Sequence, residues 1–101
     1  INQEMAQKCF DRGIALNDRK DARQACKIWK LGYSFYKGNT DLLRAVSNIC
    51  TAAASQAFNA MGACEDLPGV LEWAVDGDGF KEKALAKAAE LNCPPPAGPS
   101  P

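Results

Sequence analysis

The fold is decided by residues 22–38, ARQACKIWKLGYSFYKG. Apolar residues recur in this stretch every three or four positions, as they do along the buried face of an amphipathic helix. They are Ala22, Ala25, Cys26, Trp29, Tyr33 and Tyr36. The stretch ends at Lys37-Gly38, a basic last turn followed by the residue that most often terminates helices. It therefore predicts a helix that buries one apolar face.

Similar patterns on both sides extend this prediction to the whole chain. Further helices are expected over residues 2–16, about 40–61, a short segment from Pro68, and 80–91. The sequence Asp76-Gly77-Asp78-Gly79 predicts a sharp turn before the last helix. No segment alternates apolar and polar residues as a strand does. We expect an all-α fold, a compact disulfide-stapled bundle of four to five helices built from αα-hairpins. Residues 1–93 would form its single domain, and residues 94–101 an extended Pro-rich C-terminal tail.

Five cysteines indicate the compartment. They are widely spaced, at Cys9, Cys26, Cys50, Cys64 and Cys93, and no two form a CxxC motif of the kind found in zinc knuckles and redox sites. Disulfide bonds explain this spacing better than metal binding does. Because disulfides persist in oxidising compartments, the sequence predicts a secreted or extracellular protein.

The pairing of the cysteines follows from hairpin symmetry. Two antiparallel helices bring together residues that lie equally far from the turn between them. The first turn is expected at Asn17-Asp18, and Cys9 and Cys26 lie symmetrically about it. The turn at residues 76–79 relates Cys64 to Cys93 in nearly the same way. We therefore expect disulfides Cys9–Cys26 and Cys64–Cys93, each stabilising the fold by about 3 kcal/mol.

Cys50 is the cysteine left over by this pairing. One interpretation is a buried free thiol, because Cys50 lies on the apolar stripe of the expected central helix. Another is an intermolecular disulfide, since an odd cysteine is unusual in a secreted chain. A third is that Cys50 pairs with Cys64 or Cys93, which leaves a different cysteine free.

Catalytic chemistry finds little support in this sequence. The chain contains no histidine, so catalytic triads, Cys-His dyads and histidine-based zinc sites are excluded. The acidic turn fails the calcium-loop pattern: counted from Asp76, the positions that need Gly and Glu hold Lys81 and Lys87. No phosphate-binding glycine motif occurs. We expect no enzyme activity, no cofactor and no metal.

The charges are segregated although their sum is zero. Residues 1–44 carry a net charge of +4 and residues 45–79 a net charge of −5. A basic row of four side chains recurs at helical spacing: Arg19, Arg23, Lys27 and Lys30. It is either a solvated helix face or a docking surface for an acidic partner, including the acidic region of a second copy. Phe35 points away from the core stripe and is a candidate interface anchor. Zero net charge predicts no nucleic-acid binding, and the lack of a long apolar run predicts no membrane span.

Two resemblances add to this picture. Gly13, Leu16, Ala25, Trp29 and Gly32 fall at intervals similar to those of a tetratricopeptide-type helix pair. The chain does not keep the constant repeat length of that family, so the resemblance implies αα-hairpins only. The cysteine-stapled domain followed by a Pro-rich tract resembles extracellular plant or algal wall proteins built on Pro-rich stalks.

The function expected from these features is a non-catalytic protein-interaction or assembly module outside the cell. Its partner would be another protein or a second copy of the chain. Two alternatives stay open. One is a small carrier that holds an apolar ligand in a cavity between helices, because residues 52–60 are rich in alanine. The other is a secreted inhibitor or effector protein.

Overall fold

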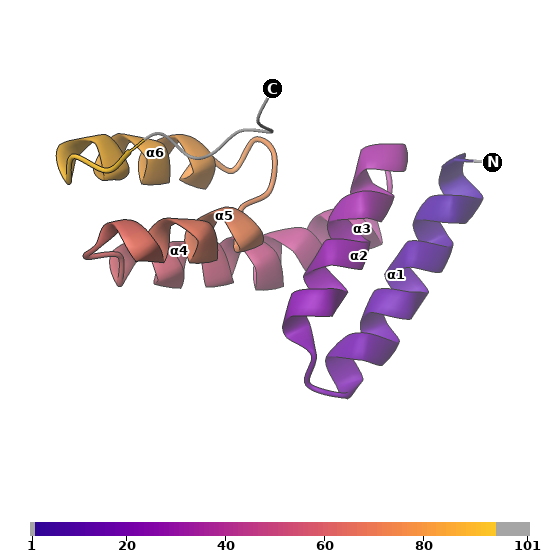
Figure 1. Cartoon of the computed structure of the whole chain (residues 1–101). Coiled ribbons are helices and arrows are strands. Elements are labelled where there is room, and N and C mark those ends of the chain that lie inside the picture. Colours follow the sequence, from indigo (N-terminus) through magenta and orange to yellow (C-terminus); the bar gives the residue numbers. More distant parts are fainter. Residues whose placement is uncertain (1, 95–101) are drawn as a thin grey trace, which may run out of the picture.

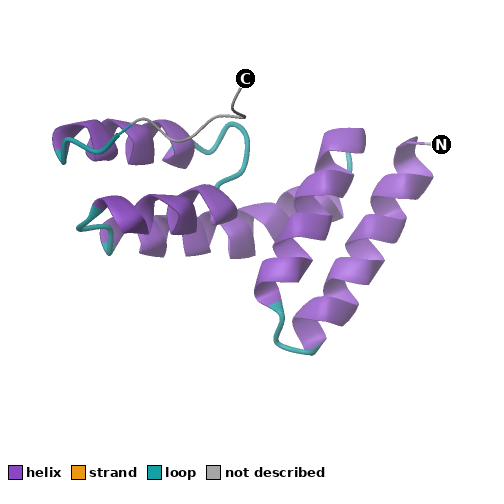
Figure 2. Ribbon diagram, viewed as in Figure 1, coloured by secondary structure: helices purple, strands orange, loops and turns teal. Residues whose placement is uncertain are grey.

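The structure, a computed structural model, describes residues 2–94 as helices joined by short turns (Figures 1 and 2). The elements are α1 (Asn2–Asp18), α2 (Ala22–Phe35), α3 (Thr40–Ala45), η1 (Val46–Thr51), α4 (Ala52–Asn59), η2 (Cys64–Asp66), α5 (Leu67–Trp73) and α6 (Phe80–Glu90). Within the described range there is no strand, and two disulfides are present. The predicted all-α, disulfide-stapled fold is confirmed. The expected Pro-rich tail falls almost entirely outside the described residues.

The central helix holds the molecule together. The side chain of Asn39 caps it by accepting a hydrogen bond from the backbone N–H of Leu42 at 2.9 Å. From there α3, η1 and α4 run on without a break, and η1 is wound as a π-helix. This helix starts behind the α1–α2 hairpin and continues beside α5 and α6 (Figure 1). None of the helices in residues 2–94 is long and apolar enough to cross a membrane.

The turn between α1 and α2 lies later in the chain than expected. Asp21 donates its backbone N–H to the carbonyl of Leu16, and Lys20 donates to Asn17, which is the hydrogen-bond pattern of a Schellman cap. Lys20 takes the left-handed conformation, with φ of 64°, that glycine usually fills. The polar pair Asn17-Asp18 suggested that the helix ends at Leu16, and no glycine marks the actual cap. Asp21 then caps α2 by accepting from Gln24.

Trp29 sets the register of the hairpin. Its indole lies against Gly13, where even a methyl group would overlap the ring, and its Nε1 donates to the carbonyl of Phe10 at 3.1 Å. Farther along the seam, Cys9 packs against Gly32 in the same close manner. In both contacts the two residues lie equally far in sequence from position 20 or 21, and not from the Asn17-Asp18 turn that we expected.

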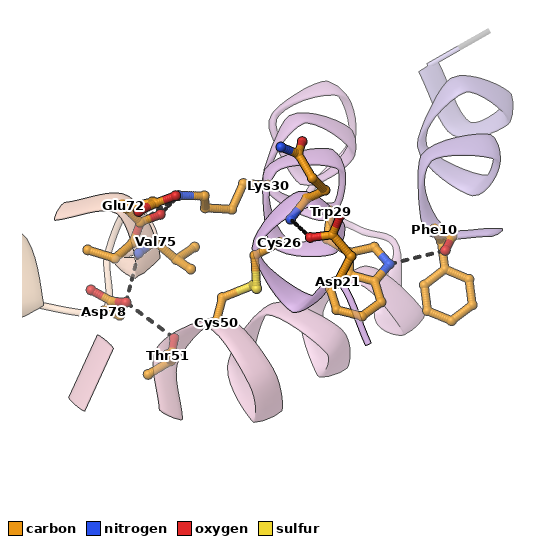
Figure 3. Close-up of a disulfide and its surroundings, with 12 residues drawn as sticks. Phe10, Asp21, Cys26, Trp29, Lys30, Cys50, Thr51, Glu72, Val75 and Asp78 are labelled. Carbon is orange, nitrogen blue, oxygen red and sulfur yellow. Dashed lines mark hydrogen bonds between the residues drawn. A yellow bond between two sulfur atoms is a disulfide. The ribbon is translucent and has the colours of Figure 1, made fainter. Parts of the chain in front are cut away.

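The expected Cys9–Cys26 disulfide is therefore wrong. In the observed register Cys9 lies opposite Gly32, about two helical turns from the level of Cys26. Cys26 instead points to the central helix and bonds to Cys50 in η1, with a Cα–Cα distance of 5.7 Å (Figure 3). Cys50, expected to be free or intermolecular, is thus paired within the chain, and the free thiol is Cys9.

The second disulfide joins Cys64 to Cys93, the pairing expected from the turn at residues 76–79. The turn is made by Gly77 and Gly79, which both have φ near +90°, a conformation that glycine adopts without strain. Helix α6 ends in another Schellman cap: Cys93 donates to the carbonyl of Ala88, and Asn92 is left-handed. This cap turns the chain back so that Cys93 reaches Cys64.

Two apolar clusters form the core. The first contains Ala6, Ala25, Cys26, Trp29, Leu42, Val46, Cys50 and Val75. The second contains Met61, Leu67, Val70, Ala84 and Ala88. Val75 and the partly buried Trp73 come from the C-terminal half but pack on the first cluster. The N-terminal half (α1, α2) and the C-terminal half (α5, α6) are therefore joined by apolar contacts. Both halves also pack on the central helix, which a disulfide links to α2.

The disulfide pattern gives a direct test of this fold. Peptide mapping of the non-reduced, alkylated monomer should find the links Cys26–Cys50 and Cys64–Cys93, with the alkyl label on Cys9. A mild reductant should open Cys64–Cys93 first, because Cys64 is exposed whereas Cys26 and Cys50 are buried. A Cys9–Cys26 link would contradict the register set by Trp29.

Candidate interaction surfaces

Lys30 belongs to the predicted basic row, yet its side chain makes hydrogen bonds within the molecule. Its Nζ donates to the carbonyl of Glu72 at 2.6 Å and to that of Ala74 at 3.3 Å. These carbonyls lie at the C-terminal end of α5, where helical backbone lacks internal donors and favours a positive charge. Burial lowers the pKa of Lys30, although the carboxylate of Glu72 acts in the opposite direction. Lys30 therefore ties α2 to α5 (Figure 3).

The other members of the basic row divide between internal and exposed positions. Arg23 pairs with Glu72, with Nε 3.7 Å from Oε2. Lys27 is exposed on α2, and Arg19 is exposed in the turn before α2 begins. Arg23 and Lys30 thus both contact Glu72 of the same chain, Arg23 through the side-chain carboxylate and Lys30 through the backbone carbonyl. The row as a whole does not form a continuous free surface.

Much of the acidic stretch is also used internally. The carboxylate of Asp78 accepts hydrogen bonds from the backbone of Val75 and Phe80 and from the Thr51 hydroxyl, which holds the glycine turn against the central helix (Figure 3). The backbone N–H groups of Gly62 and Ala63 donate to Asp66 and lower its pKa. Among the described residues, Glu65 and Asp76 are the carboxylates of this stretch for which no such contact is found.

Several surface hollows surround the glycine turn. The largest has a volume of about 540 Å³, and two others of about 290 Å³ each lie beside it. All three include Val75 and Asp76 in their walls. They are open and partly lined by charged groups, which is the character of a solvated junction and not of an apolar ligand site.

A more apolar groove runs between α1 and the central helix. It has a volume of about 230 Å³, and Ile14 at its edge is 39% exposed. Its apolar walls are Phe10, Ile14, Trp29, Ala45 and Ile49. Its polar rim is Asn17, Asp41, Arg44 and Asn48. We call this the α1–α3 groove. An apolar floor inside a rim of both charges is the composition of a protein-binding pocket.

The opposite side of the hairpin carries a second apolar surface. Met5 is 42% and Leu31 49% exposed. Cys9, Ile28 and Phe35 are half-buried, and none of the three packs against either core cluster. On α2, Ile28, Leu31 and Phe35 follow the spacing of one helix face. The contact of Cys9 with Gly32 places that face beside Met5 and Cys9. We call these five residues the outer face.

Comparisons with known proteins add no family and no relative: the chain matches no family model, no curated protein and no solved structure. Within residues 2–94, no three His, Cys, Asp or Glu residues are grouped so as to hold a metal ion. The described part of the hairpin presents two apolar surfaces, the α1–α3 groove and the outer face.

Sequence reasoning found one of the five outer-face residues, Phe35, and missed the groove. The signal for the outer face was present, because Ile28, Leu31 and Phe35 form a second apolar stripe on a helix whose main stripe contains Trp29. The groove gave no such signal. Its walls come from three successive elements, α1, α2 and the start of the central helix, and how these pack on one another is decided only by the tertiary structure.

Replacing Lys30 tests its role as a tie between the halves. Lys30→Met should lower the free energy of unfolding by about 1–2 kcal/mol, because the α5 carbonyls lose their charged donor. Lys27→Met removes the same charge from an exposed position and should change stability by less than about 0.5 kcal/mol. Urea unfolding followed by circular dichroism measures both. Equal effects of the two variants would show that Lys30 contributes only its charge.

Proposed function

We propose that this chain is an extracellular, non-catalytic module that binds another protein through the α1–α3 groove. The observation that carries the proposal is the groove itself, an apolar pocket with Asp41 and Arg44 on its rim. A partner's apolar side chain would fill the floor, and polar or charged groups beside it would meet the rim. Protein interfaces commonly have this arrangement of an apolar centre and a polar rim.

The size of the groove favours a protein partner over a carried ligand. Cavities that enclose small molecules usually have volumes of about 300–1,000 Å³ and bury most of the ligand. The groove is smaller, at about 230 Å³, and it opens to solvent beside the half-exposed Ile14. A space of this kind suits one or two side chains of a partner. The alternatives of a secreted inhibitor and an effector use the same mechanism and differ in the target.

The non-catalytic character rests on the residues available. The sequence has no histidine. The half-buried Lys30 has its ammonium group engaged by two backbone carbonyls. The location outside the cell is supported by the two disulfides, one of them fully buried in the first core cluster. A buried disulfide is part of the folded core, and disulfides form and persist mainly in oxidising compartments.

Selection from a displayed peptide library tests the proposal even though the partner is unidentified. Peptides that bind the immobilised chain should share an apolar anchor residue flanked by charged residues. Ile14→Lys should weaken their binding at least about tenfold, because it places a charge at the edge of the apolar floor. Leu31→Lys, on the outer face, is the matched control and should leave that binding unchanged.

Circular dichroism of both variants checks that they remain folded, which is expected because both positions are at least one-third exposed. The proposal fails if no peptide is enriched, or if the enriched peptides bind Ile14→Lys as tightly as the original chain. Peptides sensitive to Leu31→Lys instead would place the binding site on the outer face.

A further inference from the structure

The outer face of the α1–α2 hairpin has no covering element within residues 2–94. The central helix covers the other side of the hairpin, where it contacts both α1 and α2, and in Figure 1 it passes behind them. Two of the five outer-face side chains, Met5 and Leu31, are more than two-fifths exposed. An antiparallel helix pair with apolar residues on both sides is the arrangement found in four-helix bundles, where a second pair covers the open side.

We infer that the outer face docks a second copy of this chain about a two-fold axis that lies across the hairpin in the plane of the interface, crossing α1 near Cys9 and α2 near Gly32. This dimer goes beyond the proposed function, because it uses the side of the hairpin away from the α1–α3 groove. Each hairpin would supply two helices to a four-helix bundle, with α1 lying antiparallel on its counterpart and α2 on its own.

The apolar residues of α2 are self-complementary about this axis. Cys9 packs against Gly32, so an axis that crosses α1 at Cys9 crosses α2 at Leu31-Gly32. Ile28 and Phe35 lie at nearly equal distances on either side of that point. The two-fold axis therefore places Ile28 of one copy opposite Phe35 of the other, twice, with the two Leu31 side chains between them. Such reciprocal contacts define an isologous interface.

The charges of α1 are complementary about the same axis. Glu4 lies five residues before Cys9 and Arg12 three residues after it; both are exposed, and within the described residues neither forms an ion pair. An antiparallel crossing near Cys9 brings Glu4 of one copy to Arg12 of the other, and the pair occurs twice. A parallel crossing would place like charges opposite each other. This pairing is centred on Lys8, so the two Lys8 residues approach each other near the axis; each lies one helical turn from Glu4 of its own helix, and its long side chain extends to solvent.

The oligomeric state of the full chain tests this inference. Sedimentation equilibrium of the Cys9→Ser variant, from micromolar to millimolar concentrations, should show a reversible monomer–dimer equilibrium. Leu31→Lys should weaken the dimer at least about thirtyfold, because it puts two charges at the centre of the interface. Ile14→Lys, in the groove, should leave the dimer unchanged. A chain that is monomeric at every concentration, or a dimer indifferent to Leu31→Lys, overturns the proposal.

Charge reversal tests the two-fold arrangement itself. Glu4→Arg and Arg12→Glu should each weaken the dimer by about fivefold, and the double variant should restore it, because the reciprocal pair is then reversed as a whole. Higher salt should reduce these differences. If the dimer of the double variant is weakened by the product of the two single effects, the two residues do not interact and this geometry is overturned.

Cys9 provides an independent measure of proximity. With oxidised glutathione, one Cys9 thiolate attacks the small disulfide and releases one glutathione thiol, and the second Cys9 thiolate then displaces the other. The product is a Cys9–Cys9 disulfide, and the small disulfide is reduced by two electrons. Covalent dimer should form at least about tenfold more slowly in Leu31→Lys than in the original chain, and equal rates overturn the placement of the axis.

The substitutions on the outer face and on α1 leave the α1–α3 groove intact. A monomeric chain that still binds the selected peptides would therefore refute the dimer and not the proposed function.

Discussion

The contact between the Trp29 indole and the backbone of α1 is the constraint on which the rest of the structure depends. The ring is fully buried, it requires glycine at position 13, and its N–H is satisfied by the carbonyl of Phe10. A large aromatic side chain with one polar atom fits few positions, because both its volume and its hydrogen bond must be accommodated. This contact fixes how far α2 slides along α1. The slide in turn decides that Cys9 meets Gly32 and that Cys26 faces the central helix.

From that register the C-terminal half is anchored by three contacts of different kinds. The Cys26–Cys50 disulfide joins α2 to the central helix, Val75 inserts into the first core cluster, and Lys30 binds the end of α5. Their effect is to bring a basic helix face onto an acidic stretch of the same chain. The Arg23–Glu72 ion pair and the contacts of Lys30 with the α5 carbonyls use part of the basic row inside the molecule, so the segregated charges of the sequence do not describe the free surface.

Stapling also explains how so small a chain can present apolar surface to solvent. A domain of about 100 residues has a modest core, and each disulfide contributes stability that does not depend on further apolar burial. The α1–α2 hairpin can then keep apolar residues on both of its sides, in the groove against the central helix and on the outer face. Such exposed apolar patches mark interaction surfaces in soluble domains. These apolar patches, more than charge, support the proposed binding role.

The sequence by itself determined the helices, the sharp glycine turn and the Cys64–Cys93 pairing. The helices follow from apolar spacing and the turn from Gly77 and Gly79, and that turn lies nearly midway between the two cysteines that pair. It also determined the absence of histidine chemistry. The tertiary structure alone decided the partner of Cys26, the identity of the free thiol and the internal role of Lys30. Each of these depends on helix register. Register is set by how Trp29 packs on Gly13 of the preceding helix, across a turn whose left-handed residue is a lysine. No local pattern in the sequence encodes that fit.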